Sequence, residues 1–210
     1  MKQFATAMLV LGILLVTVPT ARAQETICPP NPSVGSTVAG NLVVPSGTQC
    51  TLDVVTVTRN VQLQTDAVLT LDGAAIDGNV SVAAGATLDV HNTHLKRTSA
   101  IDGNIRADGC NNVSLSGIII GGNVLIQNCT GDSTGFFGLF SVGGNFTCKN
   151  NFECDVFDGD ISGNVQINNN GTASVDFNTI GGNLQCQGNT DITGGNNTVG
   201  RHKSGQCAGF

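Results

Sequence analysis

Short alternations of apolar and polar residues recur along the chain between residues 38 and 200. Many begin just after a glycine–asparagine step, as in Val80-Ser81-Val82 and Val124-Leu125-Ile126. A second alternation follows near the middle of the unit, as in Leu88-Asp89-Val90. Apolar residues at every second position, β-branched residues and Gly/Asn punctuation are typical of short β-strands. Because no segment after residue 23 keeps a helical apolar stripe, the pattern predicts an all-β chain.

The alternations share one template, [Ile/Val]-x-[Gly/Arg]-Asn-[apolar]-x-[apolar], with six of eight intervals equal to 19 residues and the others 25 and 22. The leading apolar positions are Val38, Val57, Ile76, Ile101, Ile120, Val142, Ile161, Ile180 and Val199. A fixed period marks a repeat architecture, whose units bury their apolar rows only by stacking. We predict a single-stranded parallel β-helix of about eight rungs over residues 38–200. A cap segment at 24–37 and a tail at 201–210 would flank it.

One asparagine per unit follows in register, and the row comprises Asn41, Asn60, Asn79, Asn104, Asn123, Asn145, Asn164 and Asn183. The preceding glycine permits a corner with positive φ, and the asparagine amide can both donate and accept. Stacked amides are expected to form a hydrogen-bonded ladder, as in other stacked-strand structures. A ligand-binding row is the alternative. Glycosylation stays open at six Asn-x-Ser/Thr matches, namely Asn79, Asn112, Asn128, Asn145, Asn170 and Asn196.

Residues 1–23 have the pattern of a cleaved secretory signal peptide. Lys2 supplies the positive charge, residues 7–18 are apolar, and Ala21 and Ala23 occupy the two positions that signal peptidase reads. The apolar run is short for a bilayer span, which needs about 20 residues. We therefore expect secretion after cleavage before Gln24, with no transmembrane segment left. An uncleaved membrane anchor is the alternative.

Charge argues against nucleic acid as a partner. Without Lys2 and Arg22 the chain keeps seven basic residues (9 − 2) against fifteen acidic ones, a net charge of −8. Such a protein repels phosphate backbones. An extracellular protein, a polysaccharide and a second copy of the chain all remain open as partners.

All eight cysteines follow residue 23, and disulfides are the default in an oxidising compartment. Cys110 and Cys129 both lie six residues after the asparagine of their rung, so they are one rung apart, about 4.8 Å, and within disulfide reach. Cys148 and Cys186 are two rungs apart and should not pair. The predicted pairs are therefore Cys110–Cys129, Cys28–Cys50, Cys186–Cys207 and Cys148–Cys154. Zinc ligation is the rival interpretation, although the chain has no Cys-x-x-Cys pair.

The unit from Gly78 to Val90 resembles those of secreted bacterial right-handed parallel β-helix proteins. The segment from Gly181 to Cys207 is similar to the close of an uncharacterised group of such proteins. Looser likenesses link the chain to pectate-lyase-like solenoids and to the bactofilins, whose cytoplasmic location the signal and cysteines oppose. The resemblance covers about residues 38–207. It implies a right-handed, exported bacterial protein and no particular activity.

Polysaccharide lyases and hydrolases also use such solenoids, so a carbohydrate-active enzyme is the first alternative function. The tripeptide Asn189-Thr190-Asp191 is similar to one acidic motif of polygalacturonases, but the companion motifs are missing. Trp and Tyr, whose rings suit sugar clefts, are absent. We therefore predict no catalytic residue and lean against an enzyme.

Two weak metal candidates remain, and no cofactor other than calcium is considered. Asp155, Asp158 and Asp160 form the densest acidic cluster, and closely spaced oxygen ligands could hold calcium. A solvated turn is the alternative. His91 and His94 lie in the six-residue expansion of the repeat and lack a third ligand.

Phe136, Phe137 and Phe140 fall in the other expansion, at residues 132–140. If exposed, they would form a patch for a partner or for self-association. If buried, they would stack in the core with Phe146, Phe152 and Phe157, which is the arrangement we favour.

The sequence thus predicts a non-catalytic secreted or cell-surface structural or interaction protein, acting in adhesion or assembly. A ligand-binding module using the loop at 136–140 is the second alternative. Function is expected where the repeat breaks, at residues 91–97, 132–140 and the tail.

Overall fold

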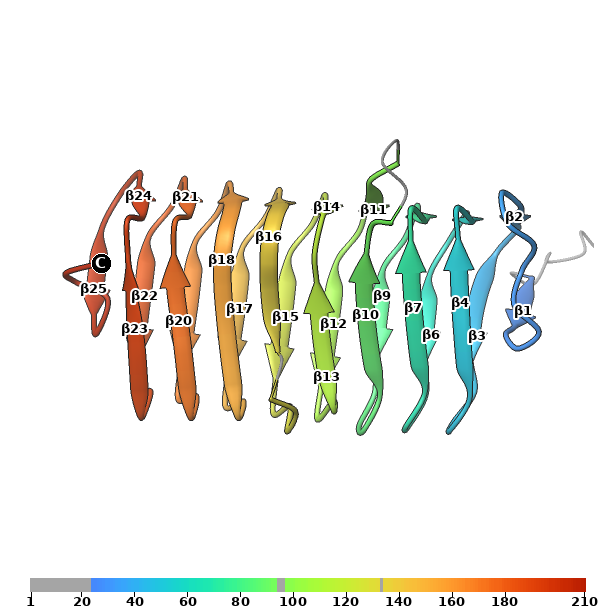
Figure 1. Ribbon diagram of the computed structural model, residues 1–210, viewed down its shortest axis with the longest axis horizontal. Coiled ribbons are helices and arrows are strands. Elements are labelled where there is room, and N and C mark those ends of the chain that lie inside the picture. The colour runs from blue at the N-terminus through green and yellow to red at the C-terminus, as the bar shows by residue number, and fades with distance from the viewer. Residues whose placement is uncertain (1–23, 94–96, 133) are drawn as a thin grey trace, which may run out of the picture.

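The computed structural model describes residues 24–93, 97–132 and 134–210, apart from the side chains of residues 136, 137 and 139. The predicted signal peptide and His94 lie outside these residues. The described chain forms an all-β parallel β-solenoid of about nine turns of ~19 residues, without a helix in the described part. Figure 1 shows the turns side by side along one axis, with consecutive colours in neighbouring turns.

Two parallel sheets make the walls of the solenoid. Sheet A has ten strands in the order β1 (Glu25–Ile27), β3 (Asn41–Val44), β6 (Val61–Leu63), β9 (Val80–Val82), β12 (Ile105–Asp108), β15 (Val124–Gln127), β17 (Phe146–Lys149), β19 (Val165–Asn168), β22 (Leu184–Gln187) and β25 (Lys203–Gly205). Each turn contributes one strand to this sheet, so the order along the sheet is the order along the chain.

Sheet B has fifteen strands, and most turns give it one long strand and one short strand. The long strands are β4 (Gln49–Asp53), β7 (Val68–Asp72), β10 (Thr87–His91), β13 (Asn112–Leu115), β20 (Thr172–Asp176) and β23 (Asp191–Gly195). The short strands are β2 (Thr37–Val38), β5 (Thr56–Val57), β8 (Ala75–Ile76), β11 (Ser99–Ile101), β14 (Ile118–Ile120), β21 (Thr179–Ile180) and β24 (Thr198–Val199). In two turns the long and short strands merge, giving β16 (Gly135–Val142) and β18 (Glu153–Ile161).

The core is filled by the alternate apolar residues of each strand. Register pairs residues one repeat apart, as in Val61 with Val80 and Val165 with Leu184. These side chains are at most 1% exposed. Burial of each such aliphatic side chain contributes about 1.5–3 kcal/mol. The repeat length therefore translates directly into columns of like residues.

The asparagines at the equivalent position of each repeat, from Asn41 to Asn183, form a continuous ladder along an outer corner of the solenoid. We call it the outer ladder. At each step the backbone N–H and the Nδ2 of one asparagine donate to Oδ1 of the asparagine one turn earlier, as in Asn164 to Asn145 at 2.9 and 3.0 Å. The other steps repeat this geometry. The side-chain amides are thus engaged in hydrogen bonds between neighbouring turns.

A second ladder, inside the wall, was not expected from the sequence. It consists of Asn151, Asn170 and Asn189, which are at most 5% exposed. In this ladder the donors point toward the later turn, since the backbone N–H and Nδ2 of Asn170 both donate to Asn189 Oδ1 at 3.0 Å. Gln206 Oε1 accepts the last pair of bonds from Asn189. A shorter ladder of the same kind joins Asn178 to Asn197.

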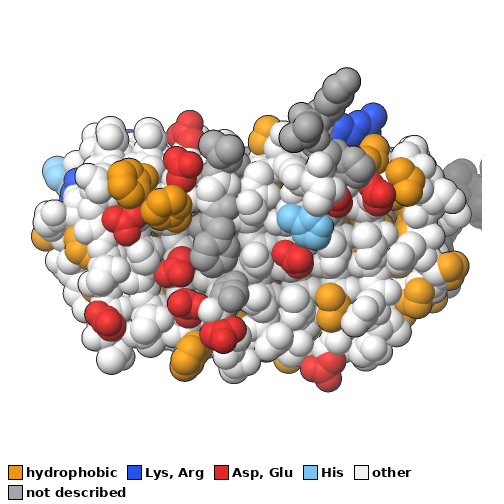
Figure 2. Space-filling view, viewed as in Figure 1, with side chains coloured by type: hydrophobic (Ala, Val, Ile, Leu, Met, Phe, Trp, Pro, Cys, Tyr) orange, Lys and Arg blue, Asp and Glu red, His pale blue; other side chains and the backbone are white. Residues whose placement is uncertain are grey.

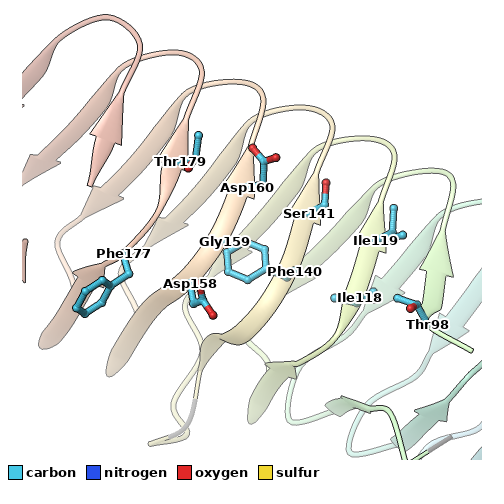
Figure 3. A pocket seen from close by; sticks show the side chains of 10 residues that line it. All are labelled: Thr98, Ile118, Ile119, Phe140, Ser141, Asp158, Gly159, Asp160, Phe177 and Thr179. Carbon is cyan, nitrogen blue, oxygen red and sulfur yellow. The ribbon is translucent and has the colours of Figure 1, made fainter. Parts of the chain in front are cut away.

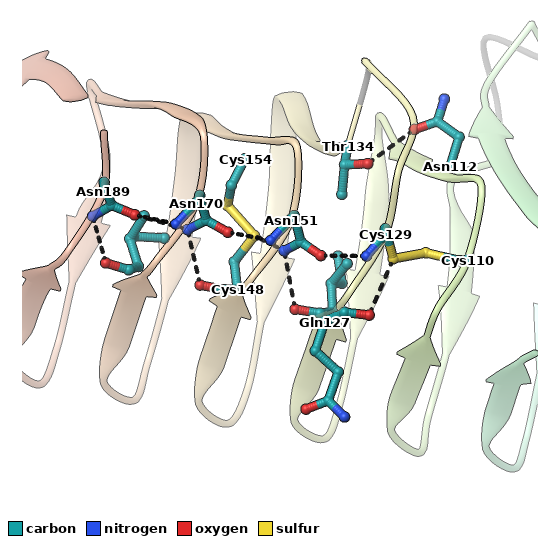
Figure 4. Close-up of a disulfide and its surroundings, with 12 residues drawn as sticks. Cys110, Asn112, Gln127, Cys129, Thr134, Cys148, Asn151, Cys154, Asn170 and Asn189 are labelled. Atoms are coloured by element: carbon teal, nitrogen blue, oxygen red, sulfur yellow. Dashed lines mark hydrogen bonds between the residues drawn. A yellow bond between two sulfur atoms is a disulfide. The ribbon is translucent and has the colours of Figure 1, made fainter. Parts of the chain in front are cut away.

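The inner ladder continues the corner at which Cys110 and Cys129 are bonded. The backbone N–H of Cys129 donates to Asn151 Oδ1 at 2.9 Å, so the disulfide and the first inner asparagine meet directly (Figure 4). All of these residues lie six positions after the outer-ladder asparagine of their turn. One corner is therefore held by a covalent bond in two turns and by amides in the next three.

The eight cysteines form four disulfides, with no free cysteine in the described chain. The pairs are Cys28–Cys50, Cys110–Cys129, Cys148–Cys154 and Cys186–Cys207, the same four expected from the sequence, of which the repeat register itself indicated Cys110–Cys129. Their Cα–Cα separations of 4.5–6.5 Å lie within the range of disulfides. Because a bonded cysteine carries no thiolate, these eight residues offer no ligand to zinc.

Both ends of the solenoid reach beyond the predicted range of 38–200. Glu25–Ile27, within the predicted cap segment at 24–37, pairs with β3. The prolines follow the strand and leave its backbone donors intact. At the other end β25 recruits part of the predicted tail. These strands raise the number of turns from about eight to about nine.

Side chains cover the two end turns. Asn31 Oδ1 accepts a hydrogen bond from the backbone N–H of Thr51 at 3.0 Å, on the outer edge of β4. At the opposite end Lys203 Nζ donates to the carbonyl oxygen of Asn197 at 2.9 Å. Phe210 packs on the core there and lies against Gly194. Covered strand edges disfavour end-to-end pairing of copies.

Candidate binding face

Residues 135–140 of the predicted expansion lie in a strand. Residues 135–142 form β16, and one of the three extra residues of this unit is absorbed as an irregularity in its pairing with β18 between Phe137 and Phe140. Gly138 and Asp158 adopt positive φ angles of 74° and 57° at this point. Such a bulge re-aims the side chains that follow it.

Phe140 points into the protein. It is 4% exposed, and its ring covers Gly159, where a Cβ atom would lie 1.9 Å from the ring Cζ. A glycine is thus required beneath this ring. The side chains of Phe136 and Phe137 lie outside the described residues. Of the residues predicted to stack with them, Phe146 is buried, but Phe152 and Phe157 are 61% and 43% exposed. The predicted core is therefore wrong for these two.

A shallow groove of about 430 Å³ crosses sheet B beside the bulge. Its walls come from the short-strand side of five neighbouring turns (Figure 3), and its lining residues are Thr98, Ile118, Ile119, Phe140, Ser141, Asp158, Gly159, Asp160, Phe177 and Thr179. Ile118 and Phe140 are buried, whereas Ile119 is exposed. The groove thus combines an apolar floor with polar and acidic rims.

Phe157 and Phe177 form the exposed aromatic pair of this face. Their ring centroids are 5.4 Å apart with an interplanar angle of 69°, an edge-to-face contact. Phe157 is the middle residue of β18 and points outward, and Phe177 directly follows β20. Two neighbouring turns therefore present aromatic surface to solvent at one place.

Acidic side chains surround this apolar surface. Figure 2 shows Asp and Glu side chains around the hydrophobic groups over β18 and β20, while Lys and Arg appear on this face only toward its margins. Asp158 and Asp160 are exposed at the groove, and Asp155 and Asp176 lie in the outward rows of β18 and β20. The local potential is therefore negative.

Two of these carboxyls bind protons more tightly than usual. Burial, and secondarily the charge of Asp176, raises the pKa of Asp155, against a hydrogen bond from the backbone of Ser174. Burial also raises the pKa of Glu153, with further contributions from Asp155 and Asp132. Raised carboxyl pKa values occur at functional sites and also in structural clusters.

The metal candidates do not converge. No group of three or more His, Cys, Asp or Glu side chains that could hold a metal ion occurs in the described chain, in which Asp155, Asp158, Asp160 and His91 are all included. The acidic triplet lies along β18, where Asp155 is partly buried and Asp158 and Asp160 are exposed. Calcium has no assembled ligand set in this geometry.

Asn189, the first residue of the polygalacturonase-like tripeptide, belongs to the inner ladder. It is 5% exposed, its Nδ2 donates to the carbonyl oxygen of Ile167 at 2.8 Å, and its Oδ1 accepts from Asn170. Its side chain is therefore committed to the wall and does not face substrate space.

Ile119 and Phe177 are candidate site residues that the sequence pattern did not single out. Each stands at a position that looks like an ordinary member of its repeat. A signal was present for Phe177, because the equivalent corner of the following turn holds Asn196, a residue that tolerates positive φ. Alignment of the second corner of each unit shows Phe177 as an aromatic residue at a position that otherwise holds glycine, asparagine, aspartate or valine.

Comparison of the chain with protein-family models, with curated proteins and with solved structures found no match. In the parts of the chain that the structure covers, no helix has the length and apolar character needed to cross a membrane.

Proposed function

We propose that the protein is a secreted, non-catalytic scaffold that binds a partner through the face formed by β16, β18 and β20. The observation that carries the proposal is the exposed apolar surface of Ile119, Phe157 and Phe177, at the place where the repeat is irregular. On a solenoid whose other outward rows are mostly polar, such a patch favours interaction.

Secretion is part of the proposal. Four disulfides favour an oxidising compartment, in agreement with the signal-like pattern of residues 1–23. The ladders and disulfides stabilise a long regular wall, which suits a durable scaffold in adhesion or assembly outside the cell.

The test is saturable binding of the labelled protein to the surface of the cells that produce it. We expect Phe157→Ser and Phe177→Asn to weaken binding, because both remove exposed aromatic surface. Phe152→Ser is the matched control, since Phe152 is also exposed but belongs neither to the Phe157–Phe177 pair nor to the lining of the groove. Equal loss of binding in the control, or no effect of the first two variants, would contradict the proposal.

A carbohydrate-active enzyme is the second candidate, favoured by the raised pKa values of Glu153 and Asp155. A protonated carboxyl beside an ionised one is the pairing that glycoside hydrolysis uses. Purified protein, with and without calcium, is therefore incubated with acidic and neutral polysaccharides, and new chain ends are measured. Turnover that disappears in Asp155→Asn would replace the binding proposal by this one.

A ligand-binding module is the second alternative, at residues 136–140, and we place its binding surface on neighbouring residues instead. Phe140 is buried and residues 135–142 form a core strand, so deletion of 136–140 would disrupt the sheet. Among the described side chains of this face, the exposed large apolar ones are Ile119, Phe157 and Phe177.

A further inference from the structure

Phe177 holds an exposed aromatic ring on a strained backbone. Its φ is 57° and its side chain is 54% exposed. The left-handed conformation costs a residue other than glycine about 1–2 kcal/mol and is rare for bulky side chains. Equivalent corners hold Gly73, Gly117, Asp158 and Asn196, and also Val54, whose side chain is partly buried. The edge-to-face contact with Phe157 offsets part of the strain but leaves both rings on the surface. Strained residues of this kind gather at binding sites.

The ring lies at one end of the groove, and Ile119 lies toward the other end, next to Thr98 (Figure 3). Between them are the buried ring of Phe140 and the flat backbone of Gly159. The volume of the groove is at the lower end of the roughly 300–1,000 Å³ typical of ligand sites. It suits one or two large apolar side chains more than a bulky ligand.

Charge narrows the choice of ligand. Asp158 and Asp160 line the groove, and Asp155 and Asp176 continue the negative surface beside the aromatic pair. An anionic polysaccharide would be repelled here, and a neutral one could donate hydroxyl hydrogen bonds to the carboxylates but carries no charge to neutralise them. A cation is attracted by them, and complementary charge also speeds association.

We infer that this groove binds an extended cationic polypeptide segment, in which a large apolar side chain is flanked by lysine or arginine. The apolar side chain would lie between Ile119 and Phe177, and the cations would pair with Asp158 and Asp160. The strands here are already paired on both sides, so recognition runs through side chains and not through addition of a strand. The inference rests on the proposed function and names its partner class.

The probe is a short synthetic peptide in which lysine alternates with phenylalanine, and its affinity is measured by calorimetry at low and physiological salt. We expect Phe177→Asn and the double variant Asp158→Asn/Asp160→Asn each to weaken binding about tenfold or more, equivalent to about 1.4 kcal/mol. The effect of the Asp variants should shrink with salt. Because asparagine tolerates positive φ, Phe177→Asn should melt no lower than the parent protein, which separates lost binding from lost folding. Ile119→Ser provides a second test of the apolar anchor.

The controls are Phe152→Ser and Asp191→Asn, which remove an exposed aromatic ring and an exposed carboxyl away from the groove. Unchanged affinity in both supports the site. Equal binding of a glutamate–phenylalanine peptide would overturn the inference. So would a neutral oligosaccharide, or a second copy of the chain, that binds at Phe177 in place of the cationic peptide, although the proposed scaffold function would survive. Polysaccharide turnover abolished by Asp155→Asn would overturn both.

Discussion

Asn170 donates two hydrogen bonds to a single acceptor one turn away, since its backbone N–H and its Nδ2 both lie 3.0 Å from Asn189 Oδ1. Its own Oδ1 accepts from the backbone N–H of Asn151 at 3.0 Å. Asn170 is 1% exposed. The amide therefore replaces the water that these buried groups would otherwise need.

We predict that Asn170→Ala lowers the free energy of unfolding by about 2–4 kcal/mol, because it leaves the backbone N–H of Asn151 buried without an acceptor. Urea unfolding followed by circular dichroism measures the change. The matched control is Asn145→Ala in the outer ladder, where water can replace the lost bonds, and about 1 kcal/mol or less is expected. Equal losses at the two positions would contradict the distinction between the ladders.

Cys129 and Asn151 occupy the same position in successive turns, which can be tested by replacing the cysteines at this corner with asparagine. Replacing both Cys110 and Cys129 by alanine should cost about 3 kcal/mol, the loop entropy of a bridge spanning about 19 residues. The double variant Cys110→Asn/Cys129→Asn should recover part of this, because residue 129 could then accept from residue 110 as Asn170 accepts from Asn151. Urea unfolding of the two double variants measures the difference. Identical midpoints would show that the corner does not accept amides there.

Asp155 and Asp108 should affect pH stability in opposite senses. The raised pKa of Asp155 means that its ionisation opposes folding above the folded-state pKa, so Asp155→Asn should raise the melting temperature at neutral pH. Hydrogen bonds from Asn128 and Gln127 lower the pKa of Asp108, so its carboxylate stabilises the fold above its ordinary value of 3.8. Asp108→Asn should lower the melting temperature at neutral pH.

Both differences should disappear in acid. The gain from Asp155→Asn vanishes as the pH falls through the raised pKa to below 3.8, and the loss from Asp108→Asn vanishes below its lowered pKa. Melting temperatures of the two variants and the parent, measured from neutral pH into acid, give the curves. Two shifts of the same sign at neutral pH would refute the assigned causes.

Gly159 should not tolerate a side chain while Phe140 covers it. Gly159→Ala is expected to cost about 1–3 kcal/mol, the usual penalty for overpacking. Phe140→Leu in the same chain should relieve part of the cost, so the two changes should be non-additive in a double-mutant cycle. Gly195→Ala is the control, because its Cβ would meet only Asp176 Oδ1 at 3.8 Å. A loss at Gly195 as large as at Gly159 would point to backbone effects instead.

The repeat was sufficient to predict the solenoid because its information is local. Period-two alternation places Val80 and Val82 on one face of a strand, and equal spacing stacks each strand on the same strand of the next turn. The same register placed Cys110 beside Cys129. The right-handed coiling of the solenoid, the bacterial origin of the protein and its export stay predictions.

The face at β16 and β18 needed three-dimensional structure. Phe140 and Phe157 are both phenylalanines within strands of sheet B, yet one ring is buried and the other exposed. The register of β16 on β18 shifts by one residue between Phe137 and Phe140, and a one-residue change of register moves side chains to the opposite face. Composition alone could not distinguish the two.

The sequence by itself determined the all-β repeat, the outer row of amides and the cysteine register, because strand period and rung length depend on neighbours along the chain. Only the tertiary structure decided that Asn151, Asn170 and Asn189 are buried as an inner ladder, and that Ile119 and Phe177 line the same groove. These relationships join residues from different turns whose side-chain directions are set at corners. Each corner depends on a few φ angles and on the space left by the next turn, which the repeat pattern does not encode.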